Sequence, residues 1–232
     1  MRCWKTPYFK ALGFVLLIAS CTNYPIAHAA TPTPKPWQTE LEKHGISISS
    51  QIFESGIKTL RATAITTSSL RKLVRFLQDE TINTKWVPYS GGARILDRTS
   101  AFSTIVHFKM NGQWPFKSRD AVAAFTLSQD ETTHTVQILI ESRPDFIPRV
   151  KDHVRLETYY GYWLLHPTGK EVHIEYVNTV DPGGLIPSWL SNQVAITTTF
   201  EAMHNLLKQL PNYTNQLPAL DFIQELPSTD FP

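Results

Sequence analysis

The fold is decided by the stretch VNTVDPGGLIPSWLSN, residues 177–192, where a strand pattern passes into a helix pattern. In the DPGG turn at 181–184, proline fixes one backbone angle and the two glycines admit positive φ angles, so the chain can turn sharply. Pro187 suits the first turn of a helix. The stretch therefore predicts a strand that is followed closely by a helix.

The helix that begins near Pro187 is the longest one that the sequence predicts. Its apolar residues recur at helical spacing and fall on one broad stripe. The stripe consists of Trp189, Ile196, Phe200, Met203, Leu207 and Leu210. Pro211 ends the pattern, because proline cannot continue a helix. A stripe of this width must be buried against another part of the fold.

Upstream of this helix, alternating apolar and polar residues predict an antiparallel sheet. Its expected strands are residues 93–98, 102–110, 121–127, 136–142, 154–165 and 172–177. The region before them is expected to hold a short helix at 37–44, a hairpin of 46–52 and 58–64, a helix at 70–77 capped by Ser68 and Ser69, and a shorter helix at 81–87. This order of elements predicts the α+β class.

Composition and charge exclude one class of function. The 232 residues are 42% apolar, which is enough for one sizeable core. The formal charge is +2, but Arg2, Lys5 and Lys10 lie in the first thirty residues, where no acidic residue occurs. Without those three, 19 basic residues stand against 20 acidic ones. The chain therefore has no excess of basic residues for binding phosphates, and we exclude a nucleic-acid-binding protein.

The beginning of the chain predicts an export signal. Basic residues precede the apolar run 11–19, which is too short to span a bilayer. IASC at 18–21 resembles a bacterial lipobox, which would end the signal at residue 20 and place a lipid on Cys21. Alternatively, AHA at 27–29 resembles an ordinary signal-peptidase site, which would end the signal at residue 29 and release a soluble periplasmic protein. The lipobox directly follows the apolar run, which favours the anchored form.

Residues 21–37 are expected to form a Pro- and Thr-rich linker, because alternating prolines favour an extended backbone. Cys3 is the only cysteine besides Cys21. The exported domain is therefore expected to have no internal disulfide.

Familiar catalytic motifs are missing from the sequence, among them the nucleophile elbow, the phosphate-binding loop and the zinc-protease helix. His173 and Glu175 share one strand face and could form a metal or acid–base site with His107. Polar pairs on the wet face of a sheet are far commoner. We therefore expect no metal, no cofactor and no catalytic residue.

Two stretches together resemble the START family of lipid-transfer domains: WPFKSRD at 114–120, before a strand, and residues 177–192, before the last helix. Further matching positions follow in order at Ser142, Arg143, Pro144, Pro148, Val154, Arg155, Gly161, Trp163, Leu165 and Pro167. The resemblance covers residues 38–210. It leaves 211–232 as a C-terminal tail, which is expected to be a poorly ordered terminus.

The resemblance implies a helix-grip fold, in which a curved antiparallel sheet wraps around the last helix and leaves an elongated apolar cavity. The residues expected to bind the lipid are Phe125, Leu139, Trp163, Trp189, Ile196, Phe200 and Met203. The residues expected to form the structural motif are Trp114, Pro115, Arg119, Asp120, Arg155, Asp181, Pro182, Gly183 and Gly184. Adjacent strand residues point to opposite sides, so Asp120 should pair with Arg155 or Arg143 rather than with Arg119.

Segment 143–153 corresponds to the loop that gates the cavity in the family together with the last helix. Phe146, Ile147 and Pro148 are its expected gate residues and could touch a membrane surface; alternatively, the loop turns these apolar side chains inward. Steroidogenic relatives have an arginine at the position of Phe125 and its acidic partner at the position of Val106, so a sterol preference does not carry over. The candidate polar groups for a ligand are His107, Glu141, Arg155 and Glu157.

The expected function is the binding and intermembrane transfer of a lipid or other hydrophobic ligand by a monomer of the bacterial envelope. Two alternatives stay open: an aromatase/cyclase-like enzyme that uses the same cavity, and a sensing protein that holds its ligand without transferring it.

Overall fold

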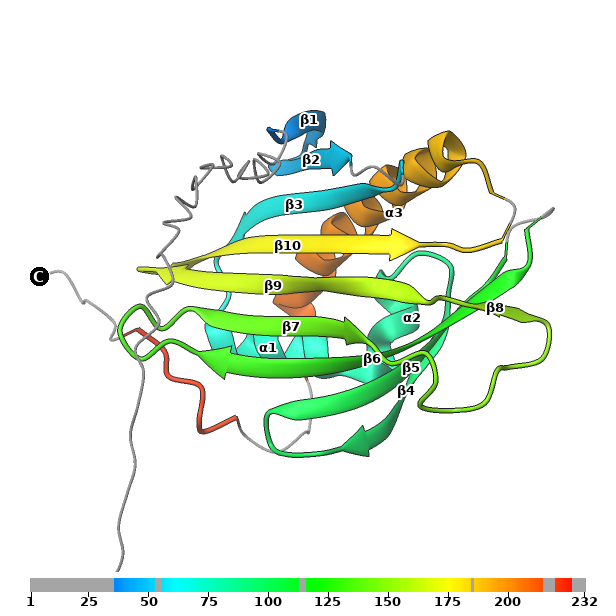
Figure 1. Ribbon diagram of the computed structural model, residues 1–232. Coiled ribbons are helices and arrows are strands. Elements are labelled where there is room, and N and C mark those ends of the chain that lie inside the picture. Colours follow the sequence, from blue (N-terminus) through cyan, green and yellow to red (C-terminus); the bar gives the residue numbers. More distant parts are fainter. Residues whose placement is uncertain (1–35, 53–55, 113–115, 185, 215–219, 227–232) are drawn as a thin grey trace, which may run out of the picture. The chain divides into compact units, whose positions relative to one another are not determined.

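The computed structural model describes residues 36–52, 56–112, 116–184, 186–214 and 220–226 (Figure 1). Within these residues, one sheet runs in the order β1-β2-β3-β10-β9-β7-β6-β5-β4, and β8 pairs with β6. Neighbours along this path are antiparallel, whereas β8 runs parallel to β6. The α+β class and the helix-grip arrangement of a curved antiparallel sheet with a long C-terminal helix are confirmed.

The strands are β1 (Gln38–Lys43), β2 (Ile46–Ile52), β3 (Lys58–Thr66), β4 (Ser90–Arg98), β5 (Ser103–Met110), β6 (Ser118–Gln129), β7 (Val136–Ser142), β8 (His153–Arg155), β9 (Thr158–Thr168) and β10 (Glu171–Asp181). The helices are α1 (Leu70–Gln78), α2 (Asn83–Trp86) and α3 (Ser188–Gln209), with 3-10 turns at Glu80–Ile82 and Leu210–Asn212. No described helix is both long enough and apolar enough to cross a membrane.

All three α-helices lie on the same face of the sheet, which we call the inner face (Figure 1). Near the start of α3, the Asn192 side chain accepts a hydrogen bond from the Lys58 backbone N–H and donates one to the Gly56 carbonyl, both at 3.0 Å. Ser69 caps α1 as expected, because its hydroxyl accepts a bond from the Lys72 backbone N–H at 3.2 Å. The helices are thus fixed to the sheet at defined points.

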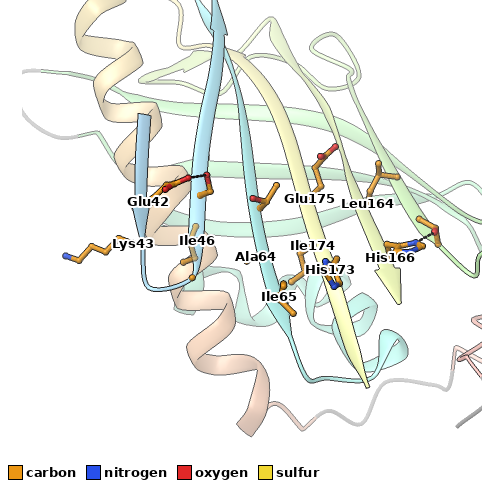
Figure 2. A pocket seen from close by; sticks show the side chains of 14 residues that line it. Glu42, Lys43, Ile46, Ala64, Ile65, Leu164, His166, His173, Ile174 and Glu175 are labelled. Atoms are coloured by element: carbon orange, nitrogen blue, oxygen red, sulfur yellow. Dashed lines mark hydrogen bonds between the residues drawn. The ribbon is translucent and has the colours of Figure 1, made fainter. Parts of the chain in front are cut away.

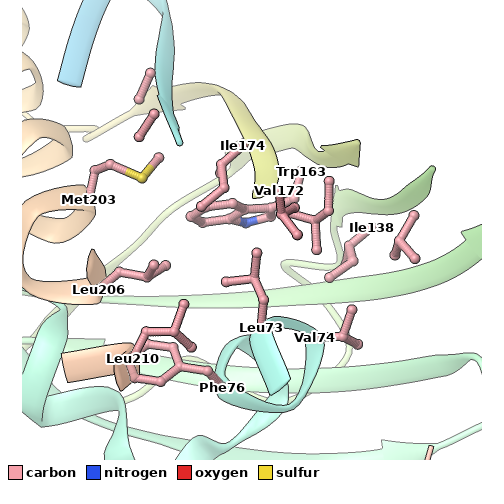
Figure 3. Packing of buried hydrophobic residues seen from close by; sticks show 14 of the residues in the cluster. Leu73, Val74, Phe76, Ile138, Trp163, Val172, Ile174, Met203, Leu206 and Leu210 are labelled. Carbon is pink, nitrogen blue, oxygen red and sulfur yellow. The ribbon is translucent and has the colours of Figure 1, made fainter. Parts of the chain in front are cut away.

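The apolar core fills the space between the inner face and the second half of α3 (Figure 3). Met203, Leu206 and Leu210 are almost fully buried there. They belong to one cluster with Leu73, Val74 and Phe76 of α1 and with Ile138, Trp163, Val172 and Ile174 of the sheet. Each such side chain contributes about 1.5–3 kcal/mol by leaving water. The second half of the α3 stripe is therefore structural.

The helix predicted at 37–44 is wrong, because the chain there forms strand β1. β1 pairs with β2 from Gln38 opposite Ser50 to Lys43 opposite Ile46. Glu40, Leu41, Glu42 and Lys43 all favour helices, but helix propensity is worth only fractions of a kcal/mol per residue. Pairing with the edge of a sheet overrides it.

The single strand predicted at 154–165 is two strands that serve different neighbours. β8 pairs with β6, whereas β9 pairs with β7 and β10. The chain changes partner at Leu156 and Glu157, a break that the continuous alternation of residue types conceals.

Part of the expected tail belongs to the folded body. Leu220 and Ile223 are buried in the main core, and Phe222 contacts Phe102 with ring centroids 4.8 Å apart. The Glu225 carboxylate accepts bonds from the backbone N–H groups of Leu70 at 3.0 Å and Arg71 at 2.8 Å. Residues 220–226 are therefore packed against the start of α1, contrary to the expectation of a poorly ordered terminus.

Candidate functional site

The inner face carries a row of aromatic side chains across β5, β6, β9 and β10. Trp163 stacks on Tyr176 of the next strand, with centroids 4.1 Å apart and planes at 16°. Phe108 contacts Phe125 at 5.6 Å and the edge of Tyr159 at 6.4 Å. These five residues share one face because cross-strand partners and residues two apart point to the same side.

The two ends of this row differ in burial. Trp163 is buried in the core, whereas Phe108, Phe125, Tyr159 and Tyr176 are only half-buried. We call these four residues the open inner patch. The second half of α3 covers the inner face over the core, whereas the open inner patch retains accessible surface.

Three polar groups lie in or beside this patch. The Tyr176 hydroxyl lies close enough to Tyr159 and to the Asn178 side chain for both groups to influence its pKa. Burial is the largest cause that raises the pKa of both tyrosines, and it raises that of Tyr159 well above its usual value. Both hydroxyls are therefore uncharged at neutral pH, and each can donate and accept a hydrogen bond.

Gly161 lies opposite Asn178 in the pairing of β9 with β10. A Cβ atom at this glycine would lie 2.0 Å from the Val177 carbonyl oxygen and 2.9 Å from the Asn178 Cα. Only glycine allows the two strands to approach this closely. The backbones of β9 and β10 are therefore closest at Gly161, directly beside the polar residue Asn178.

A second polar cluster lies on the opposite, outer face. Asp120 has no exposed surface, and its Oδ2 accepts bonds from Arg155 Nη2 at 2.7 Å, Arg155 Nε at 3.0 Å and His107 Nε2 at 2.9 Å. The predicted pair of Asp120 with Arg155 is confirmed. The alternative partner Arg143 instead pairs with Glu141 at 3.1 Å.

Asp120 remains charged in this setting. Burial alone would raise the pKa of its carboxyl group, but hydrogen bonds and charge from Arg155 and His107 outweigh burial and lower it. The ion pair is therefore intact at neutral pH, where it fixes β8 to β6.

Arg155 also holds the loop between β7 and β8. Its guanidinium donates to the carbonyl oxygens of Ile147 at 3.2 Å, Pro148 at 3.3 Å and Pro144. The Ile147 side chain packs on an outer-face cluster of Leu96, Ile105, Val122 and Ala124. The expected gate residue Ile147 thus packs against the outer face of the sheet and does not cover the open inner patch. The other two expected gate residues, Phe146 and Pro148, are exposed.

The DPGG turn is tied to the start of β6. Arg119 Nε donates to the Pro182 carbonyl at 3.5 Å, and the Asp181 carboxylate accepts a bond from the Gly183 N–H at 2.9 Å. Gly183 and Gly184 have φ angles of +62° and +74°, as the sequence predicts for this turn. Trp114 and Pro115, the first residues of the expected motif, lie outside the described residues.

The expected lipid-binding residues are dispersed by the structure. Phe125 belongs to the open inner patch, whereas Trp163, Ile196 and Met203 are buried in the core. Phe200 stacks on His204 with centroids 6.0 Å apart and lies 6.5 Å from the His44 ring, near the β1–β2 turn.

Two of these residues are corrected. Leu139 is 40% exposed, because Ile138 and Ile140 take the inner positions of β7 and alternation sends Leu139 outward. Trp189 is 70% exposed in the first turn of α3. Neither can line the space beneath α3 in this structure.

The structure also places the polar groups that were expected to contact a ligand away from the inner face. His107 and Arg155 belong to the outer cluster, Glu141 lies on the surface with Arg143, and Glu157 pairs with Arg149 in the exposed loop. The polar groups that do reach the inner face, Tyr159, Tyr176 and Asn178, escaped sequence reasoning. β9 carries aromatic residues on both faces, so alternation does not identify its inner one, whereas on β10 the polar residues His173 and Glu175 do place Tyr176 on the covered face.

The outer face of β3, β9 and β10 carries a groove of about 860 Å³ (Figure 2). Ile65, Leu164, His166, His173 and Glu175 contribute to its lining. His107 is not part of it, so the three residues considered as a metal site do not meet. Among the described residues, no group of three or more metal-ligating side chains is arranged to hold a metal ion.

The chain is similar to a known domain family and to several solved structures. The START domain model matches residues 18–216. The STAR-related lipid transfer protein of Xanthomonas axonopodis is similar in structure, with a TM-score of 0.70 and 26% identity over 75% of this chain and 98% of that chain.

Two other similar proteins extend the comparison. Human StAR-related lipid transfer protein 5 has a TM-score of 0.70 with 15% identity, over 78% of this chain and 89% of that one, and this likeness concerns the fold alone. The uncharacterized protein PA1579 of Pseudomonas aeruginosa is 24% identical over 180 residues, which make up 77% of this chain and 88% of its own.

Proposed function

Because this chain belongs to the START family, whose domain model matches residues 18–216, we propose that it binds a lipid between its inner face and α3 and transfers it between membranes. START domains bind lipids and other hydrophobic ligands. The similarity to the Xanthomonas lipid transfer protein supports the same activity here.

One observation carries the proposal. Tyr159 and Tyr176 lie so deep in the protein that burial raises the pKa of both hydroxyls, yet both side chains keep accessible surface. We infer that these two side chains line a space beneath α3 that a guest could occupy. The aromatic walls of this space suit an apolar guest.

The energetics explain why such a container is useful. Exposing an acyl chain of about sixteen carbons to water costs on the order of 13 kcal/mol, at about 0.8 kcal/mol per methylene. Spontaneous escape from a bilayer is correspondingly slow. A protein that encloses the chain removes most of this cost and can exchange its ligand at a membrane surface.

The binding step is tested by extracting the purified protein for lipid mass spectrometry and by titrating it with the fluorescent probe N-phenyl-1-naphthylamine. We expect a co-purified lipid and saturable probe binding. Phe125→Asn should weaken probe binding at least about tenfold, because it replaces an apolar wall with an amide that lacks a partner. Leu139→Asn is the matched control on the outer face. Absence of both lipid and probe binding would refute the proposal.

The transfer step needs contact with a membrane. We place this contact at Trp189 and Phe146, which are exposed at 70% and 46% and carry large apolar surfaces. Tryptophan favours the interface between water and lipid. Movement of a fluorescent lipid from donor to acceptor vesicles separates a transfer protein from one that only senses its ligand: the sensing protein would bind the lipid but leave the transfer rate at its spontaneous value.

We further propose that the protein is exported to the bacterial envelope and anchored through a lipid on Cys21. The basic residues, the short apolar run and the lipobox-like IASC support this proposal, although all of them lie outside the described residues. Cells grown with radioactive palmitate should label the native protein and not the Cys21→Ser variant. Equal, unlabelled soluble product from both would instead favour cleavage after residue 29.

A further inference from the structure

We propose that Tyr159, Tyr176 and Asn178 form a polar subsite that binds an uncharged oxygen-bearing group of the ligand, such as a hydroxyl or an ester carbonyl. This inference rests on the proposed function, because the subsite faces the space in which the lipid would lie. It specifies the chemical class of the ligand: a lipid whose buried end is polar but carries no charge.

Pairing of β9 with β10 brings the three side chains together. Tyr159 is the partner of Val180, Gly161 of Asn178, and Trp163 of Tyr176, so each of three successive pairs holds one of the polar residues. All of them point to the inner face, since Trp163 is part of the core. Because Gly161 has no side chain, nothing from β9 covers Asn178 at the position directly opposite it.

The hydrogen-bonding capacity of the three groups exceeds what they use on one another. Tyr176 and Asn178 are neighbours on the inner side of β10, and Tyr159 lies on the same side of β9. A tyrosine hydroxyl offers one donor and two acceptor positions, and an asparagine amide offers two donors and an acceptor with two lone pairs. A chain of three such groups therefore has positions left for a ligand that either donates or accepts.

The surroundings of the subsite discriminate against charge. Its neighbours are Phe108, Trp163, Val180 and Gly161. The Asp120–Arg155 pair lies on the outer face, and Arg119, at the start of β6, donates to the carbonyls of Pro182 and Lys117. A phosphate or ammonium group placed beside the tyrosines would lose its water without gaining a counter-ion, which is strongly unfavourable.

The test measures displacement of N-phenyl-1-naphthylamine from the full chain by three compounds with the same alkyl chain: dodecanol, dodecyl phosphate and dodecane. We expect dodecanol to bind at least about tenfold more tightly than dodecyl phosphate. Tyr159→Phe and Tyr176→Phe should each weaken dodecanol about 5- to 10-fold, the usual net effect of one lost hydrogen bond, and leave dodecane unchanged. Tyr160→Phe is the matched control, because Tyr160 is 52% exposed on the outer face.

The readout is the ratio of dodecanol to dodecane affinity, which a general loss of packing would not alter. Tighter binding of dodecyl phosphate than of dodecanol, or an unchanged ratio in both Phe variants, would overturn the subsite while leaving lipid binding in place. Failure of the native protein to bind the fluorescent probe at all would overturn the subsite together with the proposed function.

Discussion

Asp120 shows how one residue holds several elements together. Its carboxylate is completely buried and is bonded to Arg155 of β8 and His107 of β5. Arg155 in turn bonds three carbonyls of the loop before β8. The adjacent Arg119 points to the other side and bonds the turn before α3. Arg119 and Asp120 are therefore adjacent in sequence but make separate contacts on opposite sides of the sheet.

Asp120→Asn is expected to lower the free energy of unfolding by about 3 kcal/mol, because it leaves the Arg155 charge buried without its partner. Urea denaturation measures the loss. The control is Glu141→Gln in the exposed pair with Arg143, which should change stability by less than about 0.5 kcal/mol. Equal effects of the two changes would contradict the role given to the buried pair.

The same carboxylate predicts a dependence on pH. Its pKa is lower in the folded protein than in the unfolded chain, so its contribution is present above the unfolded-state pKa of about 4 and is lost as the pH falls further. The native protein should therefore lose stability below about pH 4 more steeply than Asp120→Asn. Parallel curves of unfolding free energy against pH would show that Asp120 is not the group responsible.

Gly161 is expected to tolerate no side chain. In Gly161→Ala the new Cβ would lie 2.0 Å from the Val177 carbonyl oxygen, so β9 and β10 must separate, at a cost of at least about 2 kcal/mol. Gly169→Ala is the comparison: φ there is +60° but no atom lies within 4 Å, so only the backbone strain of about 1 kcal/mol applies. Thermal unfolding ranks the two, and a milder effect at Gly161 would contradict the close approach.

Among the elements, the loop between β7 and β8 depends on the guanidinium geometry of Arg155. Arg155→Lys keeps the charge but loses the fork that bonds the carbonyls of Pro144, Ile147 and Pro148. Trypsin should then cut after Arg149 and Lys151 at least about tenfold faster, because the loop opens more often. Arg143→Lys, at an exposed position, is the control. An unchanged cleavage rate in Arg155→Lys would mean that other contacts hold the loop.

The two ends of α3 are expected to have different functions. Met203 is buried among core residues, so Met203→Ala should cost about 2–5 kcal/mol of stability. Trp189 is 70% exposed, so Trp189→Ala should change stability by less than about 0.5 kcal/mol and yet slow lipid transfer between vesicles. Chemical denaturation and the vesicle assay separate the two effects. Unaltered transfer in Trp189→Ala would remove the proposed membrane contact.

The sequence predicted the positions of the helices and strands better than it predicted which face of each strand is buried. The DPGG turn, the cap at Ser69 and the long helix all follow from local rules, and the structure has them at the expected places. The prediction for β1 was wrong because its residues favour a helix and only pairing with β2 makes them a strand. The prediction that Leu139 binds the lipid was wrong, because alternation divides a strand into two faces without identifying the inner one.

At the scale of the whole molecule, the inner face is divided between a packed core and a patch that keeps accessible surface. The second half of α3, with α1 and part of the sheet, forms a solid core. The four half-buried aromatic side chains of the open inner patch keep accessible surface. A solid core and an accessible aromatic patch are thus built on one sheet.

The position of the site could be predicted from the sequence only in part. Phe125 was expected at the cavity wall and lies in the open inner patch, whereas Trp163, Ile196 and Met203, named for the same wall, are core residues. An apolar side chain that packs and one that lines a cavity have the same sequence signature, because both avoid water. Only the three-dimensional arrangement tells them apart.

The most direct test of lipid binding beneath α3 is photo-crosslinking with hexadecanol that carries a diazirine at the middle of its chain, followed by residue-level mass spectrometry. We predict adducts on the open inner patch, at Phe108, Phe125, Tyr159 and Tyr176. Adducts confined to the outer groove, at Ile65, Leu164 or His173, would contradict the account, because the hydrophobic guest would then lie on the opposite face of the sheet.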